Sequence, residues 1–150
     1  MRASSPPPSI VDTNVVVSGL LTADAASPVA RVLDGMLAAA FPFVLSDALV
    51  AEYRSVLRRP SLRKAHGLSV DDLDVILVDL AQRGIVLAPV RASPAPDPGD
   101  QHLWDLLAAR EDLVLVTGDK LLQQDRVMRR RIFSAAAFVQ RWLSDAQYKF

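Results

Sequence analysis

Four acidic side chains, far apart along the chain, stand where a carboxylate could do chemistry: Asp12, Glu52, Asp100 and Asp119. Asp12 interrupts the apolar run 10–17, which is typical of a short buried strand that then turns into a helix. A buried carboxylate destabilises a fold unless it is paired or binds a cation. In open α/β sheets, ligands bind at the carboxyl ends of the strands, which is where the sequence places Asp12.

Glu52 and Asp100 lie on the predicted core-facing sides of two helices. In the helix expected over 47–58, Glu52 stands three residues after Leu49 and four before Val56, on the apolar stripe. Asp100 begins a helix whose apolar residues follow three, four and seven positions later. An acid on a buried face breaks the binary pattern, and such breaks tend to mark functional sites.

Asp119 lies in the turn Thr117-Gly118-Asp119, directly after another predicted buried strand. All four acids are therefore expected to project from the same edge of one sheet. Neighbouring carboxylates repel one another, which raises their pKa values or recruits a cation. Oxygen ligands without sulfur favour Mg²⁺ or Mn²⁺. Two such ions about 3.5–4 Å apart recur in enzymes that hydrolyse phosphodiesters.

Each acid also has a purely structural interpretation. Asp12 and Asp119 suit helix N-caps or Asx turns. Asp100 suits a first helical turn, where an acid stabilises the helix dipole. Glu52 suits the edge of its stripe, paired with an arginine at position 54 or 58.

The elements that must position these acids alternate between short apolar strands and amphipathic helices. This pattern predicts a three-layer α/β/α sandwich with a central parallel sheet, similar to a Rossmann-like fold. The expected strands cover 10–12, 43–45, 85–87, 113–116 and, at one edge, 131–133. The expected helices cover 15–21, 29–40, 47–58, 70–82, 100–110 and 135–143, with a short one after Asp119. Ser46 is expected to cap the third helix, Pro60 to end it, and Gly84 to close the fourth.

The composition is that of one globular domain. The chain has 150 residues, 23% of them charged, with a net charge of zero and no cysteine. We expect a disordered, proline-rich tail over 1–8 and a single domain over 9–150. The absence of cysteine excludes disulfides and thiolate metal sites, and no stretch suits a signal peptide or a membrane span. A cytoplasmic protein is expected.

The ordered motifs resemble those of a known family. Ile10-Val11-Asp12-Thr13-Asn14, Leu45-Ser46 with Glu52 six residues after the serine, Asp97-Pro98-Gly99-Asp100 and Val116-Thr117-Gly118-Asp119 are similar to the motifs of PIN-domain nucleases. The likeness runs from about residue 9 to 143 and is nearest to the bacterial VapC-like toxins of toxin–antitoxin pairs. That branch commonly has an acid where Gly99 stands.

The resemblance implies a PIN-like fold and a Mg²⁺- or Mn²⁺-dependent endoribonuclease. It carries the catalytic, metal-binding roles to Asp12, Glu52, Asp100 and Asp119. The polar supporting positions fall on Asn14, Ser46 and Thr117, and Asp97 is assigned a supporting role through water. Asp100 is preferred to Asp97 as the third acid because the apolar helix lies directly behind it. The implied partners are an RNA substrate, a cognate antitoxin protein and a second or further copy of the chain.

Contact with RNA needs positive charge that the zero net charge hides. One basic cluster lies on or after the Glu52 helix and includes Arg54 and Arg58; the other spans 126–131 and includes Arg129 and Arg130. Either could line a substrate groove or form an ordinary solvated face. The two histidines, His66 and His102, are expected at the surface.

Two other functions compete with the nuclease. A Rossmann-like phosphatase would use Asp12 as nucleophile, but its usual second acid two residues later is replaced by Asn14. A non-catalytic PIN-like or receiver-like binding module would act through a protein partner. The presence of all four acids argues against a decayed enzyme.

Overall fold

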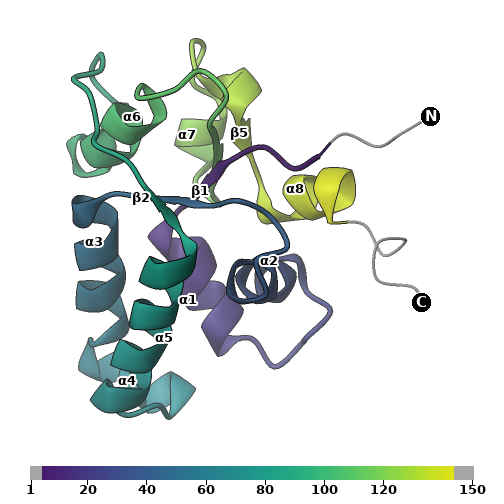
Figure 1. Cartoon of the computed structure of the whole chain (residues 1–150), viewed down its shortest axis with the longest axis vertical. Helices are drawn as coiled ribbons and strands as arrows, with labels where there is room; N and C mark the ends of the chain where they lie inside the picture. The colour runs from purple at the N-terminus through teal and green to yellow at the C-terminus, as the bar shows by residue number, and fades with distance from the viewer. Residues whose placement is uncertain (1–4, 144–150) are drawn as a thin grey trace.

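The computed structural model describes residues 5–143, which form five short parallel strands surrounded by helices (Figure 1). The strands are β1 (Ser9–Val11), β2 (Val44–Leu45), β3 (Ile85–Val86), β4 (Val114–Val116) and β5 (Ile132–Phe133). β1 pairs with β4, β4 with β5, and β2 with β3, all in parallel. A parallel bridge between Ser9 and Phe43 joins the two groups, so the strand order is β3-β2-β1-β4-β5.

The helices connect successive strands, as parallel pairing requires. They are α1 (Thr13–Leu21), α2 (Pro28–Leu37), α3 (Asp47–Leu57), α4 (Pro60–His66), α5 (Val70–Arg83), α6 (Gln101–Leu107), α7 (Lys120–Gln123) and α8 (Ala135–Trp142), with 3₁₀ turns η1 (Pro98–Asp100) and η2 (Arg129–Arg131). In Figure 1, α6 and α7 lie above the strands and α3 to α5 below them. The predicted α/β/α architecture with a parallel sheet is confirmed.

Serine caps fix where several helices begin. Ser46 Oγ accepts a hydrogen bond from the Leu49 amide at 3.1 Å, which confirms the predicted cap of α3. Ser69 and Asp72 form a reciprocal capping box at the start of α5. Ser27 caps α2, whose first residue is Pro28. These side chains satisfy amides that have no partner inside the helix, so the sequence sets the register of each helix locally.

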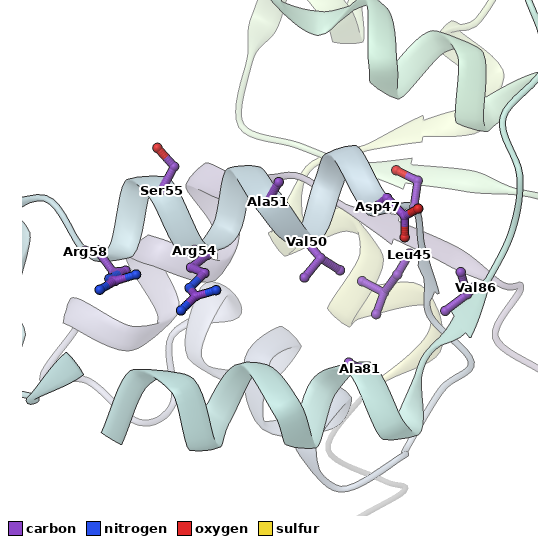
Figure 2. A pocket seen from close by; sticks show the side chains of 10 residues that line it. Leu45, Asp47, Val50, Ala51, Arg54, Ser55, Arg58, Ala81 and Val86 are labelled. Carbon is purple, nitrogen blue, oxygen red and sulfur yellow. The ribbon is translucent and has the colours of Figure 1, made fainter. Parts of the chain in front are cut away.

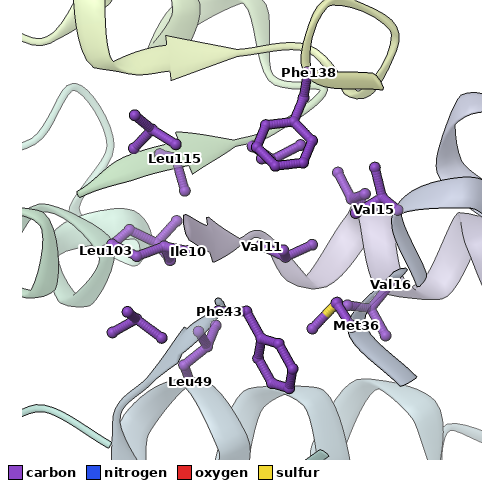
Figure 3. Close-up of a cluster of buried hydrophobic side chains, with 14 of the residues drawn as sticks. Ile10, Val11, Val15, Val16, Met36, Phe43, Leu49, Leu103, Leu115 and Phe138 are labelled. Carbon is purple, nitrogen blue, oxygen red and sulfur yellow. The ribbon is translucent and has the colours of Figure 1, made fainter. Parts of the chain in front are cut away.

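The core lies on both sides of the central strands (Figure 3). Ile10 and Val11 of β1 and Leu115 of β4 are almost fully buried. Helical side chains such as Leu49 of α3 and Phe138 of α8 cover them. Strands that are covered on both faces read as continuous apolar runs, which is why the strands could be recognised in the sequence.

Two helix ends lie where they were predicted, but each has a feature that the prediction did not include. Pro60 ends α3, but it also begins α4, an extra helix that closes at Gly67 with a left-handed φ of 71°. Gly84 closes α5 as expected, with an ordinary φ of −78°. A Cβ at Gly84 would lie 2.7 Å from Leu45 Cδ1, so close packing against β2 is what requires glycine there.

Both ends of the chain extend past the described residues. Of the expected tail over 1–8, residues 1–4 lie outside the described range, as do residues 144–150 of the expected domain. Within the described range, the Val114 amide donates a hydrogen bond to the Pro8 carbonyl at 3.1 Å, so the segment just before β1 follows β4. No helix between residues 5 and 143 is long and apolar enough to cross a membrane.

Candidate metal-binding active site

Asp12 directly follows β1 and is the N-cap of α1. Its side chain is only 6% exposed, and its Oδ2 accepts a hydrogen bond of 2.7 Å from Thr117 Oγ1. The Asp12 amide donates to the Val116 carbonyl at 2.9 Å, so the pairing of β1 with β4 continues to the acid itself. The expected place of Asp12 at the carboxyl end of a buried strand is therefore what the structure has.

Thr117 connects two of the acids. It is fully buried after β4, and its hydroxyl oxygen accepts a hydrogen bond of 3.1 Å from the Asp119 amide while donating to Asp12. Asp119 in turn caps α7, because its Oδ1 accepts from the Leu121 amide at 2.9 Å. The capping interpretation of Asp119 is thus correct, and the same residue also stands at the edge of the sheet beside Asp12.

Glu52 projects from α3 toward the same edge. The side chain is 35% exposed. Its Oε1 accepts from Thr13 Oγ1 at 2.6 Å, and its Oε2 accepts from His102 Nε2 at 2.7 Å. Arg54, the expected partner in the surface interpretation, lies instead 3.6 Å from Asp74. Glu52 therefore faces Thr13 and His102 rather than forming a surface ion pair with Arg54.

His102 corrects the expectation that both histidines are surface residues. Its side chain is only 20% exposed, and it contacts Glu52 from the first turn of α6. His66 is also half-buried, at the end of α4, where its ring bonds to the Leu57 carbonyl and the Leu68 amide. The one local signal for His102 was its position two residues after Asp100, which the sequence interpretation did not use.

The loop before α6 carries Asp97 and Asp100. Asp97 is exposed, and its Oδ1 accepts from the Gly99 amide at 3.0 Å, so it shapes the turn. Asp100 is half-buried at the start of α6. Burial, the largest cause, and then the nearby charges of Asp12, Asp119, Asp97 and Glu52 together raise the pKa of Asp100 to about 6. Asp100 therefore experiences the charge of every other acid assigned to the site.

The pKa of Asp12 is also raised. Burial raises the pKa of Asp12, the hydrogen bond from Thr117 opposes that rise, and the charge of Glu52 adds to it. Tyr53 of α3 is fully buried and donates its hydroxyl hydrogen to the Val11 carbonyl. Burial, with Asp12 and then Glu52, raises the pKa of Tyr53 well above its ordinary value. Burial is the largest cause of all three shifts, and the charges of neighbouring acids add to it.

The remaining supporting positions have different surroundings. Ser46 is buried as the α3 cap, so its oxygen already serves a backbone amide. Asn14 is exposed on the first turn of α1, next to Thr13. Asp97 lies at the rim of the site and Thr117 at its centre, bound to Asp12. Thr13 is a further site residue that sequence reasoning missed.

The donor set fits a hard divalent cation. Its members are carboxylate and hydroxyl oxygens, and burial together with neighbouring acids raises the pKa values of Asp12 and Asp100. As placed in residues 5–143, no three acidic or histidine side chains surround a single point as a finished metal site would. The two oxygens of Glu52 instead face the hydrogen-bond donors of Thr13 and His102.

A groove of about 600 Å³ lies between α3 and α5 (Figure 2). Val50 and Ala81 face each other across it, and Arg54 and Arg58 lie toward one end. Of the second basic cluster, Arg129 and Arg130 are exposed. Arg131 is not available in the same way, because its guanidinium donates to the carbonyls of residues 107, 110 and 113.

Comparison with known families bears on this geometry. A family profile described as a PIN domain matches residues 9–121, which is most of the chain and includes all four acids. A search among curated proteins found no match. PIN-domain proteins are generally nucleases that use divalent metal ions. The parallel sheet, the acids at its carboxyl edge and the matched residues agree, and the chain belongs to the PIN-domain family.

Proposed function

We propose that this protein is a metal-dependent endoribonuclease that hydrolyses RNA phosphodiester bonds. The observation that carries the proposal is geometric: Thr117 binds both the Asp12 side chain and the Asp119 amide, and Thr13, the residue after Asp12, binds Glu52. Burial and the charges of the other acids raise the pKa of Asp100 to about 6, which agrees with this crowding. Like charges are not held together in a fold without an opposing gain, and a divalent cation supplies one. General nuclease activity in the family supports the same conclusion.

Asp12, Glu52, Asp100 and Asp119 would hold Mg²⁺ or Mn²⁺. When bound, such an ion lowers the pKa of a water molecule and stabilises the charge that develops on phosphate oxygens. The protein itself contributes orientation. Thr117 holds Asp12 through its hydroxyl and also accepts from the Asp119 amide, so two acids keep a fixed separation. Thr13, in the adjacent helix α1, donates a hydrogen bond that orients Glu52.

The RNA would approach along basic side chains. Arg54 and Arg58 line the groove beside α3, the helix that carries Glu52. Arg129 and Arg130 are exposed and offer a second contact for phosphates. Phosphate contacts of this kind position a nucleic acid without reading its sequence.

The cellular role proposed is that of a VapC-like toxin in the cytoplasm, with an antitoxin protein and a second or further copy of the chain as partners. The motif resemblance supports it. The competing non-catalytic binding module is less favoured, because all four acids are present and the family is generally catalytic. Induced expression in bacteria should arrest growth with the wild-type chain and not with Asp100→Asn. Equal growth of the two strains at equal protein levels would contradict the toxin role.

RNA cleavage by the purified protein tests the enzymatic proposal. Wild type should cut RNA in Mg²⁺ or Mn²⁺ and stop in EDTA, and Asp100→Asn should lose the activity while remaining folded. Asp34→Asn, which changes an exposed acid on α2, is the matched control and should cleave as wild type does. Cleavage that persists in EDTA, or in Asp100→Asn at the wild-type rate, would contradict the proposal.

A further inference from the structure

His102 occupies a position that the four-acid site does not by itself explain. Its Nε2 lies 2.7 Å from Glu52 Oε2, although the two residues are 50 positions apart in the sequence. An ionised carboxylate only accepts hydrogen bonds, so Nε2 carries the hydrogen of this contact. The imidazole is therefore a donor committed to one of the proposed metal ligands.

Glu52 is held from two opposite elements. Thr13 of α1 donates to one carboxylate oxygen, and His102 of α6 donates to the other. α1 begins directly after Asp12, and α6 begins directly after Asp100. The pair of hydrogen bonds thus ties Glu52 to the two helices whose starts carry the other acids. Each Glu52 oxygen retains a lone pair that is not used by these donors.

The Nδ1 atom of His102 indicates that this residue does not serve to stabilise the fold. Among the described residues, His102 Nδ1 is the one buried side-chain nitrogen or oxygen that has no hydrogen-bond partner. An unsatisfied buried polar atom destabilises a fold, whereas an apolar side chain of similar size would avoid that loss. A residue that breaks a local rule without a structural gain is expected at a functional site.

We propose that His102 is a positioning residue that, together with Thr13, orients the Glu52 carboxylate for binding a divalent cation. This inference rests on the proposed function. Donors that orient a metal-binding carboxylate in this way affect metal affinity about 10–100-fold in other proteins. His102 therefore acts through Glu52 and does not contact the cation itself.

Calorimetric titration with Mn²⁺ tests this role without relying on activity. His102→Ala should weaken Mn²⁺ binding roughly 10–100-fold, and His102→Gln should recover most of it, because its amide can donate from a similar reach. In a Glu52→Gln background, His102→Ala should cause no further loss, because the group it orients is gone. His66→Ala, which removes the other half-buried imidazole, is the matched control and should bind Mn²⁺ as wild type does.

The outcomes separate this inference from the proposed function. Wild-type Mn²⁺ affinity in His102→Ala would overturn the positioning role and leave the nuclease proposal standing. The same conclusion follows if His102→Gln is as impaired as His102→Ala, or if the loss persists in the Glu52→Gln background. Wild type that neither binds Mn²⁺ nor cleaves RNA would overturn both proposals. If His102→Ala does not fold, then His102→Gln and Thr13→Val decide: Thr13→Val should weaken Mn²⁺ binding and His102→Gln should nearly retain it, and the reverse result overturns the role.

Discussion

At the scale of single residues, two hydroxyl groups organise the acids. Thr117 bonds to Asp12 and to the Asp119 amide, and Thr13 bonds to Glu52. Each hydroxyl lies directly beside an acid of the site, at position 13 next to Asp12 and at position 117 two before Asp119. The acids could be found from the sequence because each one interrupts an apolar pattern. Of their hydroxyl partners, Thr117 was named only through the family resemblance and Thr13 was missed, because a threonine at a strand end has many ordinary explanations.

Thr117→Val tests the first of these hydroxyls. Valine has nearly the same shape but cannot donate to Asp12, so Asp12 Oδ2 would lose the hydrogen bond from Thr117. We expect roughly 10–100-fold slower RNA cleavage and a loss of about 1–3 kcal/mol in the free energy of unfolding. Thr22→Val is the control, since Thr22 Oγ1 accepts only from an amide in an exposed turn. Wild-type activity in purified Thr117→Val would show that this hydrogen bond does not matter.

The raised pKa of Asp100 predicts how stability depends on pH. With a pKa of about 6 when folded and an ordinary value of 3.8 when unfolded, the folded protein holds this proton longer as pH rises. The contribution of Asp100 to stability is therefore present below about pH 4 and is lost between about pH 4 and pH 6. Asp100→Asn should remove that loss, so that thermal melting above pH 6 occurs at a higher temperature than in wild type. The measurement is the melting temperature of wild type and of Asp100→Asn at several pH values between about 4 and 6. Identical pH profiles in the two proteins would refute the raised pKa of Asp100.

At the scale of elements, local signals predicted most of the framework. Ser46 and Ser69 mark helix starts, and the apolar runs around Ile10 and Leu115 mark buried strands, because these effects act within a few residues. The extra helix that begins at Pro60 was missed because proline fits both the end of one helix and the first turn of the next. His102 was missed for a different reason: its partner Glu52 is 50 residues away, so only tertiary packing reveals the contact.

The loop before α6 has its own attachment. Asp105 Oδ1 accepts from the Ala92 amide at 3.0 Å and from Gln101 Nε2 at 3.0 Å, while Gln101 Oε1 accepts from the Ala95 amide at 2.8 Å. The hydrogen bond from Gln101, followed by that from the Ala92 amide, lowers the pKa of Asp105. Two residues of α6 thus hold the proline-rich segment that leads to Asp97 and Asp100.

Asp105→Ala should release this segment. Amide hydrogen exchange at Ala92 should accelerate, and the rate of RNA cleavage should fall because Asp100 is less firmly placed. Asp112→Ala is a suitable control, because Asp112 is an exposed acid whose partner, Arg110, lies outside the loop. Unchanged exchange at Ala92 in Asp105→Ala would mean that the loop is held by other contacts.

At the scale of the whole molecule, the net charge is zero, and the four acids of the candidate site are only some of the charged groups, since Arg54 also lies beside Asp74. The acids gather at the carboxyl edge of the sheet, while Arg54 and Arg58 line the groove between α3 and α5 (Figure 2). Arg131 shows why a basic run in a sequence overstates a basic surface. Its guanidinium is turned inward onto three carbonyls, and burial lowers its pKa.

The salt dependence of RNA binding tests which arginines face the substrate. The double variant Arg54→Ala/Arg58→Ala should bind single-stranded RNA more weakly and reduce the slope of affinity against salt by up to about 1.4, since each phosphate contact on a single strand contributes about 0.7. Arg83→Ala, at the end of α5 and outside the lining of the groove, is the control. An unchanged slope would remove the α3 groove from the RNA path and leave Arg129 and Arg130 as the candidates.

The central claim is that acids from four separate segments form one cation site. Mn²⁺ binding by wild type and Asp12→Asn, measured side by side by calorimetry at neutral pH, tests it most directly, because Asp12 is the most buried of the four acids and bonds to Thr117. The site as assigned predicts saturable binding in wild type and its loss in Asp12→Asn, with the fold retained. Equal Mn²⁺ affinity in the two proteins would contradict it.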